Sequence, residues 1–492
     1  MTLRPLSFAF GDRLSPAARP RPRLQSLAAA LCLPLLLAAC AAPSMPPDQA
    51  PVTPPPGWYA PVPHDGSLDA LGQWWGSLQD PVLVELITAA ESVSGTLAQA
   101  RSRIEQARAT RIGAGAALGP KVDGAANASR GFSQQTLGVA TIAQATVQAS
   151  WETDLFGGNR AARDAAQARF EGAQAQWHDA RVSVAAETAD RYFTLRSCGD
   201  TLAVMRDDAG SRSETARLTT LSADAGFQSP ANAELARASS AEASGRLTQQ
   251  RAQCDTEVKA LVGLTDMPEP MLRDRVAQAP KAAVTPFAVP EVPAQLLAQR
   301  PDVYALERDV AAASADVGTA EAARYPSLRL TGSIGGGQVR TQGVSTRSAT
   351  WSIGPIELTV PLFDGGRRAA DAAAARARYE EAVALYRAKV RDAVREVEQA
   401  LVALQSAIDR GADAQAAADG YRAAFVAAEA SYRSGLGSLI EMEDVRRTAL
   451  AAQMNVVTLQ RERISAWISL YRAMGGGWTR PTLPTQAGKS SQ

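Results

Sequence analysis

The chain carries two copies of one sequence pattern, and this duplication narrows the range of folds open to it. Three short segments occur in the same order in both halves, at a nearly constant separation. Repeats of about 200 residues are far longer than the roughly 20–50 residues of a solenoid unit, so we interpret them as a tandem duplication. The paired landmarks are Pro120 and Pro326, 206 residues apart, Phe156 and Phe363, 207 apart, and Gly226 and Gly435, 209 apart.

Each half predicts the order helix, two strands, long helix, turn and long helix. In the segment 327–334, apolar residues such as Leu330 alternate with polar ones such as Thr331, which is typical of a strand with two unlike faces. The glycine-rich stretch 335–348 is expected to be a hairpin loop. The expected strands are 121–132 and 141–156 in the first half, and 327–336 and 349–363 in the second.

These four expected strands are too few to close a barrel. In lipid an open sheet edge is excluded, because each unpaired backbone group costs several kcal/mol. If the strands cross a membrane, several copies of the chain must therefore pool them. The strands alone also leave open a soluble sandwich, because their small Ala, Ser and Thr residues suit either environment.

A heptad pattern follows the second pair of strands. Its length is unusual, because residues 366–430 contain no proline, and 65 residues at ~1.5 Å each make a helix close to 100 Å long. Two apolar stripes predict a helix that packs against neighbours on two sides, whereas an ordinary buried helix would not explain this length. The first stripe is Val383, Val390, Val397 and Leu404, with Tyr386, Ala393 and Ala400 beside it, and the second is Val394, Leu401 and Ile408.

Two cysteines give an independent check on the first helical hairpin. Cys198 and Cys254 lie 28 residues before and 28 residues after Gly226, where the helix is expected to turn. Two helices folded back at that glycine bring both cysteines to the same height. We expect a disulfide, which an oxidising periplasm permits and which loop-closure reasoning values at about 4 kcal/mol. Two unpaired buried thiols are the alternative.

The N-terminus has the order of a secretory signal, with arginines followed by the apolar run 27–37 and then small residues. A buried core helix is the alternative interpretation. The run closes on Leu37-Ala38-Ala39-Cys40, which resembles the lipobox of bacterial lipoproteins. This resemblance implies cleavage before Cys40 and its acylation, with palmitate among the chains. Ala41, in place of aspartate, implies the outer membrane. Several acyl chains anchor stably where one is marginal.

Composition argues against several classes of function. The net charge is +1, which disfavours a nucleic-acid partner bound through bulk charge. The chain has two histidines, His64 and His178, and no constellation of residues that would hold a metal or cofactor or carry out catalysis. We therefore expect no metal, no cofactor and no enzymatic activity.

Considered together, the ordered motifs resemble those of the TolC-like outer-membrane efflux protein family, in its NodT-type lipoprotein branch. Each motif is short, but their order and duplication make the resemblance specific. The motifs are Gly72-Gln73-Trp74-Trp75, Asp80-Pro81-Val82-Leu83, Trp151-Glu152-Thr153-Asp154-Leu155-Phe156-Gly157, Arg300-Pro301-Asp302-Val303, Ala322-Ala323-Arg324-Tyr325-Pro326-Ser327, Pro361-Leu362-Phe363-Asp364-Gly365-Gly366 and Tyr432-Arg433-Ser434-Gly435.

The resemblance implies a mixed α+β membrane protein. Three copies would pool twelve strands into an outer-membrane β-barrel and join their helices into a periplasmic tunnel. Such a channel passively conducts substrates, as in multidrug export, from an inner-membrane pump of the RND type and a periplasmic adaptor (a membrane fusion protein). The expected segments are a signal peptide at 1–39, a proline-rich tether at 40–70, a first repeat at 71–263 with its hairpin at 159–263, a linker at 264–300, a second repeat at 301–477 with its hairpin at 366–474, and a polar tail at 478–492.

The same resemblance assigns functional residues to the hairpin tips. The family's aperture carboxylates align with Glu441 and Asp444, whereas Glu443 stands where an aliphatic residue is usual. Three copies would place these carboxylates in rings that favour cations and form a gate at the periplasmic end of the tunnel, although a solvated charged helix face is the alternative. Adaptor contact is expected at Gly226, Ser229, Gly435 and Gly437. The competing function is a lipid-anchored periplasmic scaffold or adaptor without a channel.

Overall fold

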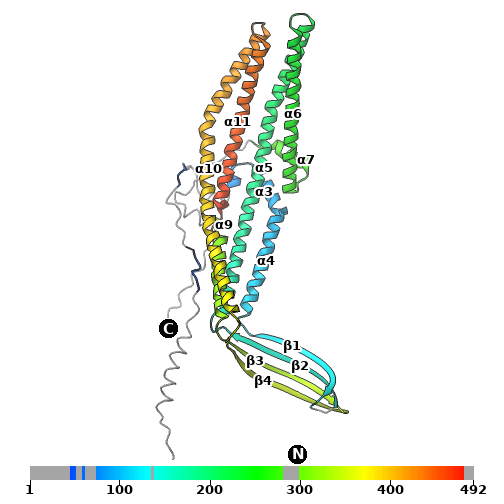
Figure 1. Ribbon diagram of the computed structural model, residues 1–492. Coiled ribbons are helices and arrows are strands. Elements are labelled where there is room, and N and C mark those ends of the chain that lie inside the picture. Colours follow the sequence, from blue (N-terminus) through cyan, green and yellow to red (C-terminus); the bar gives the residue numbers. More distant parts are fainter. Residues whose placement is uncertain (1–44, 51–57, 61–73, 135–137, 281–298, 481–492) are drawn as a thin grey trace, which may run out of the picture.

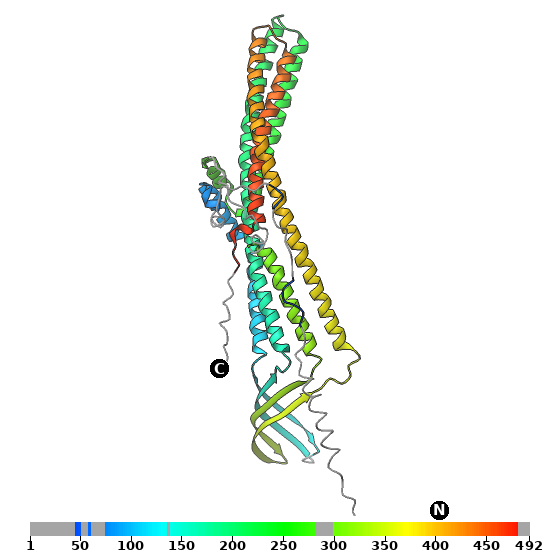
Figure 2. The ribbon, with the colours of Figure 1, turned by 90° about the vertical axis from the view of Figure 1, so that its left-hand side faces the viewer.

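The structure is a computed structural model that describes residues 45–50, 58–60, 74–134, 138–280 and 299–480. A long helical bundle carries a four-stranded sheet at one end and two helical hairpins at the other (Figures 1 and 2). Cys40 and the expected signal peptide lie outside the described residues. The elements are α2 (Trp74–Ser77), α3 (Pro81–Val93), α4 (Gly95–Ala116), β1 (Lys121–Ser133), β2 (Gly138–Thr153), α5 (Gly158–Asp224), α6 (Pro230–Thr265), α7 (Glu269–Gln278), α9 (Pro301–Ala322), β3 (Ser327–Thr341), β4 (Val344–Thr359), α10 (Arg367–Arg433), α11 (Leu439–Ala473) and η2 (Gly475–Gly477).

The sheet is antiparallel throughout, with the strand order β1-β2-β3-β4. Directly paired residues share a face, because side chains alternate along each strand. Val147 pairs with Ile334, which pairs with Trp351, so one face is apolar and exposed. The opposite face is polar, as in the row formed by Gln148 and Ser333. The alternation expected from the sequence is therefore present in the paired sheet.

The predicted loop over 335–348 is wrong. β3 continues to Thr341 and β4 begins at Val344, so the hairpin turns at Gln342 and Gly343 alone, both with positive φ (48° and 82°). Such a two-residue turn matches the twist of its flanking strands.

The glycines that suggested a loop serve strand pairing instead. A Cβ on Gly335 would lie 2.6 Å from the carbonyl oxygen of Ala145 on β2, so this strand contact requires a residue without a side chain.

Two other strand predictions were displaced. The strand expected at 141–156 is β2, Gly138–Thr153, and the strand expected at 349–363 is β4, Val344–Thr359. Both begin earlier because hairpin pairing extends to the turns, and both end earlier because residues such as Asp154 cap the next helix. The Asp154 carboxylate accepts hydrogen bonds from the backbone N–H groups of Asn159 and Arg160 at 3.0 and 2.9 Å.

The helices α5 and α10 each span 67 residues and run the length of the bundle. Val390, Val397 and Leu404 of the first heptad stripe are buried in α10. In the second stripe, Leu401 is buried but Ile408 remains 44% exposed. One copy of the chain therefore covers one side of α10 and leaves much of the other open. Among the described residues no single helix has the length and apolar character to cross a bilayer, although α3 and α4 pass that test as a pair bent by 51°.

An aromatic and ionic core joins the helices midway along the bundle. Trp74 and Tyr471 stack with ring centroids 5.3 Å apart. Nearby, Arg300 Nη2 and Lys389 Nζ each lie 2.7 Å from Asp302 Oδ2. Burial raises the pKa of Asp302, but the hydrogen bonds and charges of these two cations outweigh that effect and lower it to about 2.

The described parts of the expected tether pack on the helices. The carboxylate of Glu398 on α10 accepts hydrogen bonds from the backbone N–H groups of Tyr59 and Ala60, at 2.7 and 2.9 Å. Farther toward the sheet, Ser314 Oγ on α9 donates to the carbonyl oxygen of Pro46 at 2.6 Å. Residues 58–60 therefore lie against α10, and residues 45–50 lie against α9, nearer the sheet.

Candidate functional site

Both helical hairpins turn in loops of the same design, which we call the first tip (residues 225–229) and the second tip (residues 434–438). Each contains a glycine at the same place in the repeat, Gly226 with φ 77° and Gly435 with φ 76°, a conformation that glycine adopts without steric cost. A serine then caps the returning helix in each tip. Ser229 Oγ accepts from Asn232 N at 3.2 Å, and Ser438 Oγ accepts from Glu441 N at 3.1 Å.

Each tip presents a large apolar side chain that the sequence analysis did not select. Phe227 is 85% exposed and Leu436 is 87% exposed, and they occupy equivalent positions of the two repeats. Next to Leu436, a Cβ on Gly437 would lie 3.2 Å from Ser431, so the second tip is tightly closed. The signal that could have identified this pair was the repeat itself, because both copies place an apolar residue directly after the tip glycine.

The expected gate carboxylates lie at the start of α11, next to the second tip. Glu441 and Asp444 are both exposed, and Asp444 pairs with Arg447 at 2.7 Å. In the first repeat, Asn232 occupies the position equivalent to Glu441. One copy of the chain thus presents two carboxylates from α11 on its surface and does not itself enclose an aperture.

Glu443 lies in a buried ionic network between the two hairpins. Its carboxylate accepts hydrogen bonds from Arg212 Nη1 at 2.9 Å, from Ser239 Oγ at 2.9 Å and from Arg446 Nη1 at 2.6 Å. Arg212 on α5 also binds Asp208, and it is only 8% exposed. Two arginines and two carboxylates therefore connect α5 to α11, and the hydroxyl of Ser239 adds α6 to the network.

The other arginine of the network, Arg446, is enclosed more completely. It is 3% exposed, donates to Thr215 Oγ1 at 3.0 Å and lies over the ring of Phe425 at 5.1 Å. Burial lowers its pKa. The same Glu–Arg pair in the first repeat, Glu234 and Arg237, forms an ion pair on the exposed surface of α6. One sequence motif thus occupies a buried environment in one repeat and a solvated one in the other.

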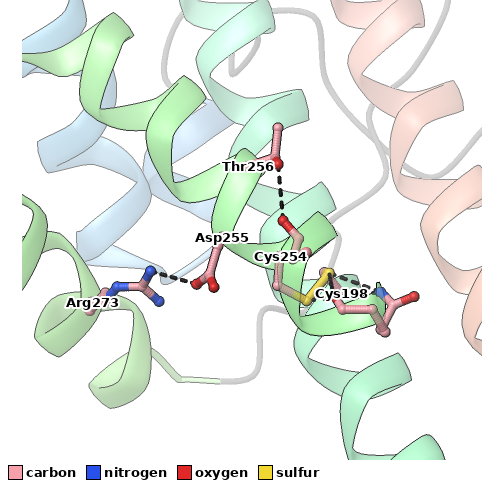
Figure 3. Close-up of a disulfide and its surroundings, with 7 residues drawn as sticks. Cys198, Cys254, Asp255, Thr256 and Arg273 are labelled. Atoms are coloured by element: carbon pink, nitrogen blue, oxygen red, sulfur yellow. Dashed lines mark hydrogen bonds and ion pairs between the residues drawn. A yellow bond between two sulfur atoms is a disulfide. The ribbon is translucent and has the colours of Figure 1, made fainter. Parts of the chain in front are cut away.

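Cys198 and Cys254 are joined by a disulfide, with their Cα atoms 5.6 Å apart (Figure 3). The bond connects α5 to α6 far below the first tip. Next to it, Arg273 on α7 binds Asp255 on α6 at 2.6 Å, which fastens α7 to the same hairpin. The disulfide has no counterpart in the second repeat, because α10 and α11 contain no cysteine.

The other features considered for chemistry stand apart from the tips. Within the ranges that the structure describes, no group of three or more His, Cys, Asp or Glu could hold a metal ion. His178 lies midway along the bundle, with its ring against Trp177 and Trp478, and burial and the charge of Arg181 lower its pKa.

Known proteins resemble the chain in both sequence and fold. Residues 86–265 and 292–476 match the family model of outer membrane efflux proteins. The pyoverdine export outer membrane protein OpmQ of Pseudomonas putida is 32% identical over 471 residues, which cover 91% of this chain and 97% of that protein. The nodulation protein T of Rhizobium leguminosarum is 27% identical over 460 residues, with 92% and 94% covered.

Among solved structures, the CmeC outer membrane channel of Campylobacter jejuni has a similar fold. It superimposes with a TM-score of 0.76, covering 88% of this chain and 95% of the channel, at 22% sequence identity.

Proposed function

Because the chain belongs to the outer membrane efflux protein family, it is an efflux channel of the outer membrane, and we propose that three copies form the conducting unit. Their pooled strands would make a twelve-stranded barrel, and their α5, α6, α10 and α11 helices a periplasmic tunnel. Members of the family are channels rather than enzymes, and we propose no chemical step for this chain.

The main support for a pooled barrel is the structure of the sheet. Within one copy, β1 and β4 each pair along one edge only, and one face of the sheet is apolar and exposed while the other is polar. An apolar outer face, a polar interior and closed edges are what a membrane barrel requires. The partly uncovered second stripe of α10, with Ile408 exposed, supports a neighbouring copy at the level of the helices.

The two tips support contacts at the periplasmic end. We propose that the first and second tips bind a periplasmic adaptor, with Phe227 and Leu436 as apolar anchors beside Gly226, Ser229, Gly435 and Gly437. The adaptor would connect the channel to an inner-membrane pump of the RND type. Glu441 and Asp444 would form carboxylate rings at the tunnel mouth that favour cations. Acylation of Cys40 would add a lipid anchor six residues before Pro46, which contacts α9.

The cargo follows from the pump that supplies the channel. One relative is named for pyoverdine export and another, from Pseudomonas putida, for toluene efflux. We propose that this chain likewise passes small molecules rather than folded proteins, and that its own carboxylates add only a preference for cations.

Single-channel conductance of the purified, lipidated protein in a planar bilayer tests these proposals. We expect discrete cation-preferring openings, and a weaker cation preference in the variant Glu441→Gln/Asp444→Asn. The control, Glu234→Gln/Glu242→Gln, removes the same charge from exposed positions on α6 and should conduct like the wild type.

The outcomes separate the parts of the proposal. Openings that are unchanged in the first variant would retain the channel and reject these gate residues. Verified trimers that never conduct, with or without the mutations, would favour a channel that is sealed at rest or the lipid-anchored scaffold.

A further inference from the structure

The two β-hairpins have a one-sided distribution of charge. Residues 124–151 and 322–356 contain no aspartate or glutamate, so the acidic residues of the sheet lie at its helix-proximal end, as Asp123, Glu152 and Glu357 do. Toward the hairpin turns, the charged side chains are all arginines: Arg130, Arg340 and Arg347. In a closed barrel every neighbouring strand would come from the same acid-free segments, so no carboxylate of the sheet could neutralise them.

All three arginines point to the apolar face. Arg130 and Arg340 both pair with Thr141, from opposite sides, and Arg347 pairs with Gln338, two residues before Arg340. These residues have the same strand parity as Val147, Ile334 and Trp351, so they share the exposed apolar face rather than the polar one. Each of the three arginines is exposed.

The depth of the arginines matches the outer boundary of a bilayer. They lie 9 to 13 residues from the helix-proximal ends of their strands. At ~3.3 Å per residue and a tilt of about 40°, this distance is roughly 23–33 Å along the membrane normal. The apolar band of an outer-membrane barrel is about 25 Å tall, so the arginines emerge at the level of the outer headgroups.

The arrangement also places like charges near one another. Arg340 and Arg347 are diagonal neighbours on adjacent strands, at roughly 7–8 Å, and Arg130 lies two strands from Arg340, at roughly 10 Å. Like charges at such positions are unfavourable unless an anion lies between them. Guanidinium groups bind phosphate through paired hydrogen bonds, and basic clusters at a membrane surface bind anionic headgroups.

We propose that Arg130, Arg340 and Arg347 form a lipid-facing binding site for an outer-leaflet lipid whose headgroup carries two phosphates, of the lipid A type. Arg340 and Arg347 would together bind one phosphate, and Arg130 the other. The site rests on the proposed barrel, because only there does this face meet lipid. Its occupant would fasten the channel in the leaflet that carries such lipids.

Native mass spectrometry of the full-length protein in nanodiscs tests the site. The nanodiscs contain phosphatidylethanolamine with a small, equal fraction of either lipid A or phosphatidylglycerol. We expect the wild type to retain lipid A, and at least tenfold more of it than phosphatidylglycerol. The variant Arg130→Gln/Arg340→Gln/Arg347→Gln should lose at least tenfold in lipid A retained, whereas Arg130→Lys/Arg340→Lys/Arg347→Lys keeps the charge and should retain most of it.

The matched control is Arg101→Gln/Arg103→Gln/Arg206→Gln, which removes three exposed arginines from α4 and α5 and should behave like the wild type. Equal losses in this control and in the glutamine variant would overturn the site. Equal retention of phosphatidylglycerol would overturn the two-phosphate headgroup. The conductance of the same samples is also measured. A glutamine variant that conducts but loses lipid A supports the site. A glutamine variant that conducts and retains lipid A rejects the lipid site but leaves the proposed channel intact. If the glutamine variant does not assemble, Arg340→Gln/Arg347→Gln decides the same question: it should lose lipid A relative to the wild type, and unchanged retention would overturn the site.

Discussion

The buried network around Glu443 makes a sharp test of what connects the two hairpins. Glu443→Gln keeps the size of the side chain and one carbonyl acceptor but removes the charge. Arg212 then retains Asp208 as its one carboxylate partner in the network, together with the hydroxyl of Ser239, and Arg446, 3% exposed, loses the carboxylate at 2.6 Å from it. Removing one partner of a buried ion pair costs about 3–5 kcal/mol, because the remaining charge is left uncompensated in the interior. We expect a loss of about 3 kcal/mol in the free energy that opposes local opening of α11.

Hydrogen exchange measured by mass spectrometry reads this loss locally. Peptides from the first half of α11 should exchange on the order of 100-fold faster in Glu443→Gln than in the wild type, since each 1.4 kcal/mol corresponds to about tenfold. Peptides from the sheet, which is remote from the network, should be unchanged.

The repeat supplies the control. Glu234→Gln makes the same substitution in the equivalent pair, where Glu234 and Arg237 are 69% and 56% exposed. A surface ion pair contributes about 0–1 kcal/mol, so exchange on α6 should change by less than about fivefold. If α11 in Glu443→Gln exchanges like the wild type, or if the two variants have equal effects, the network does not hold the hairpins together.

Three further predictions follow from other parts of the structure. The pKa of Asp302 is lowered to about 2, so its contribution of about 2 kcal/mol to the free energy of unfolding is complete above pH ~4 and is lost as the pH falls toward 2. Asp302→Asn should therefore lower the midpoint of thermal unfolding at pH 7 and flatten the dependence of that midpoint on pH between 4 and 2. An unchanged acid profile would contradict this. Cys198→Ser/Cys254→Ser should lower the free energy of unfolding by about 4 kcal/mol, because the disulfide no longer closes a loop in the unfolded chain; denaturant unfolding measures this. The wild type under reductant should match the variant. A variant as stable as the oxidised protein would refute the estimate. Phe227→Ala/Leu436→Ala should weaken binding of the cognate adaptor at least tenfold in a pull-down titration, because both apolar side chains are exposed at the tips. Bilayer conductance should be unchanged. A parallel fall in conductance would mean that these residues support the channel itself.

The two hairpins differ in how firmly they are held. A disulfide and the Arg273–Asp255 ion pair fasten α5, α6 and α7 to one another, whereas α10 and α11 have no such covalent link. The network at Glu443 is the ionic connection between these two units near the tips. Because it consists of buried charges, its strength depends on complete pairing, and the loss of one member has a large effect.

Much of the architecture could be predicted from local pattern. Alternation identifies strands because side chains point to opposite faces, and the two hairpins could be recognised because the same landmarks occur twice. The equal distances of Cys198 and Cys254 from Gly226 placed both cysteines at one height, since helical rise is uniform. The loop expected at 335–348 failed because propensity treats glycine as a turn residue, whereas Gly335 lies in a strand that approaches β2 too closely for a side chain.

What the sequence alone determined was therefore the periodicity and the order of the elements, because these depend on residues close together in the chain. Which face of each element is buried was decided by tertiary packing. Glu234–Arg237 and Glu443–Arg446 are the same motif at the same place in the repeat, and the two residues of the motif do not distinguish a buried pair from a solvated one. Only the second is buried, because α5, over 200 residues away in sequence, brings Arg212 and Asp208 to it. Whether a charged pair is buried depends on the element that packs against it as well as on its own helix, and the Glu–Arg motif contains no information about that second element.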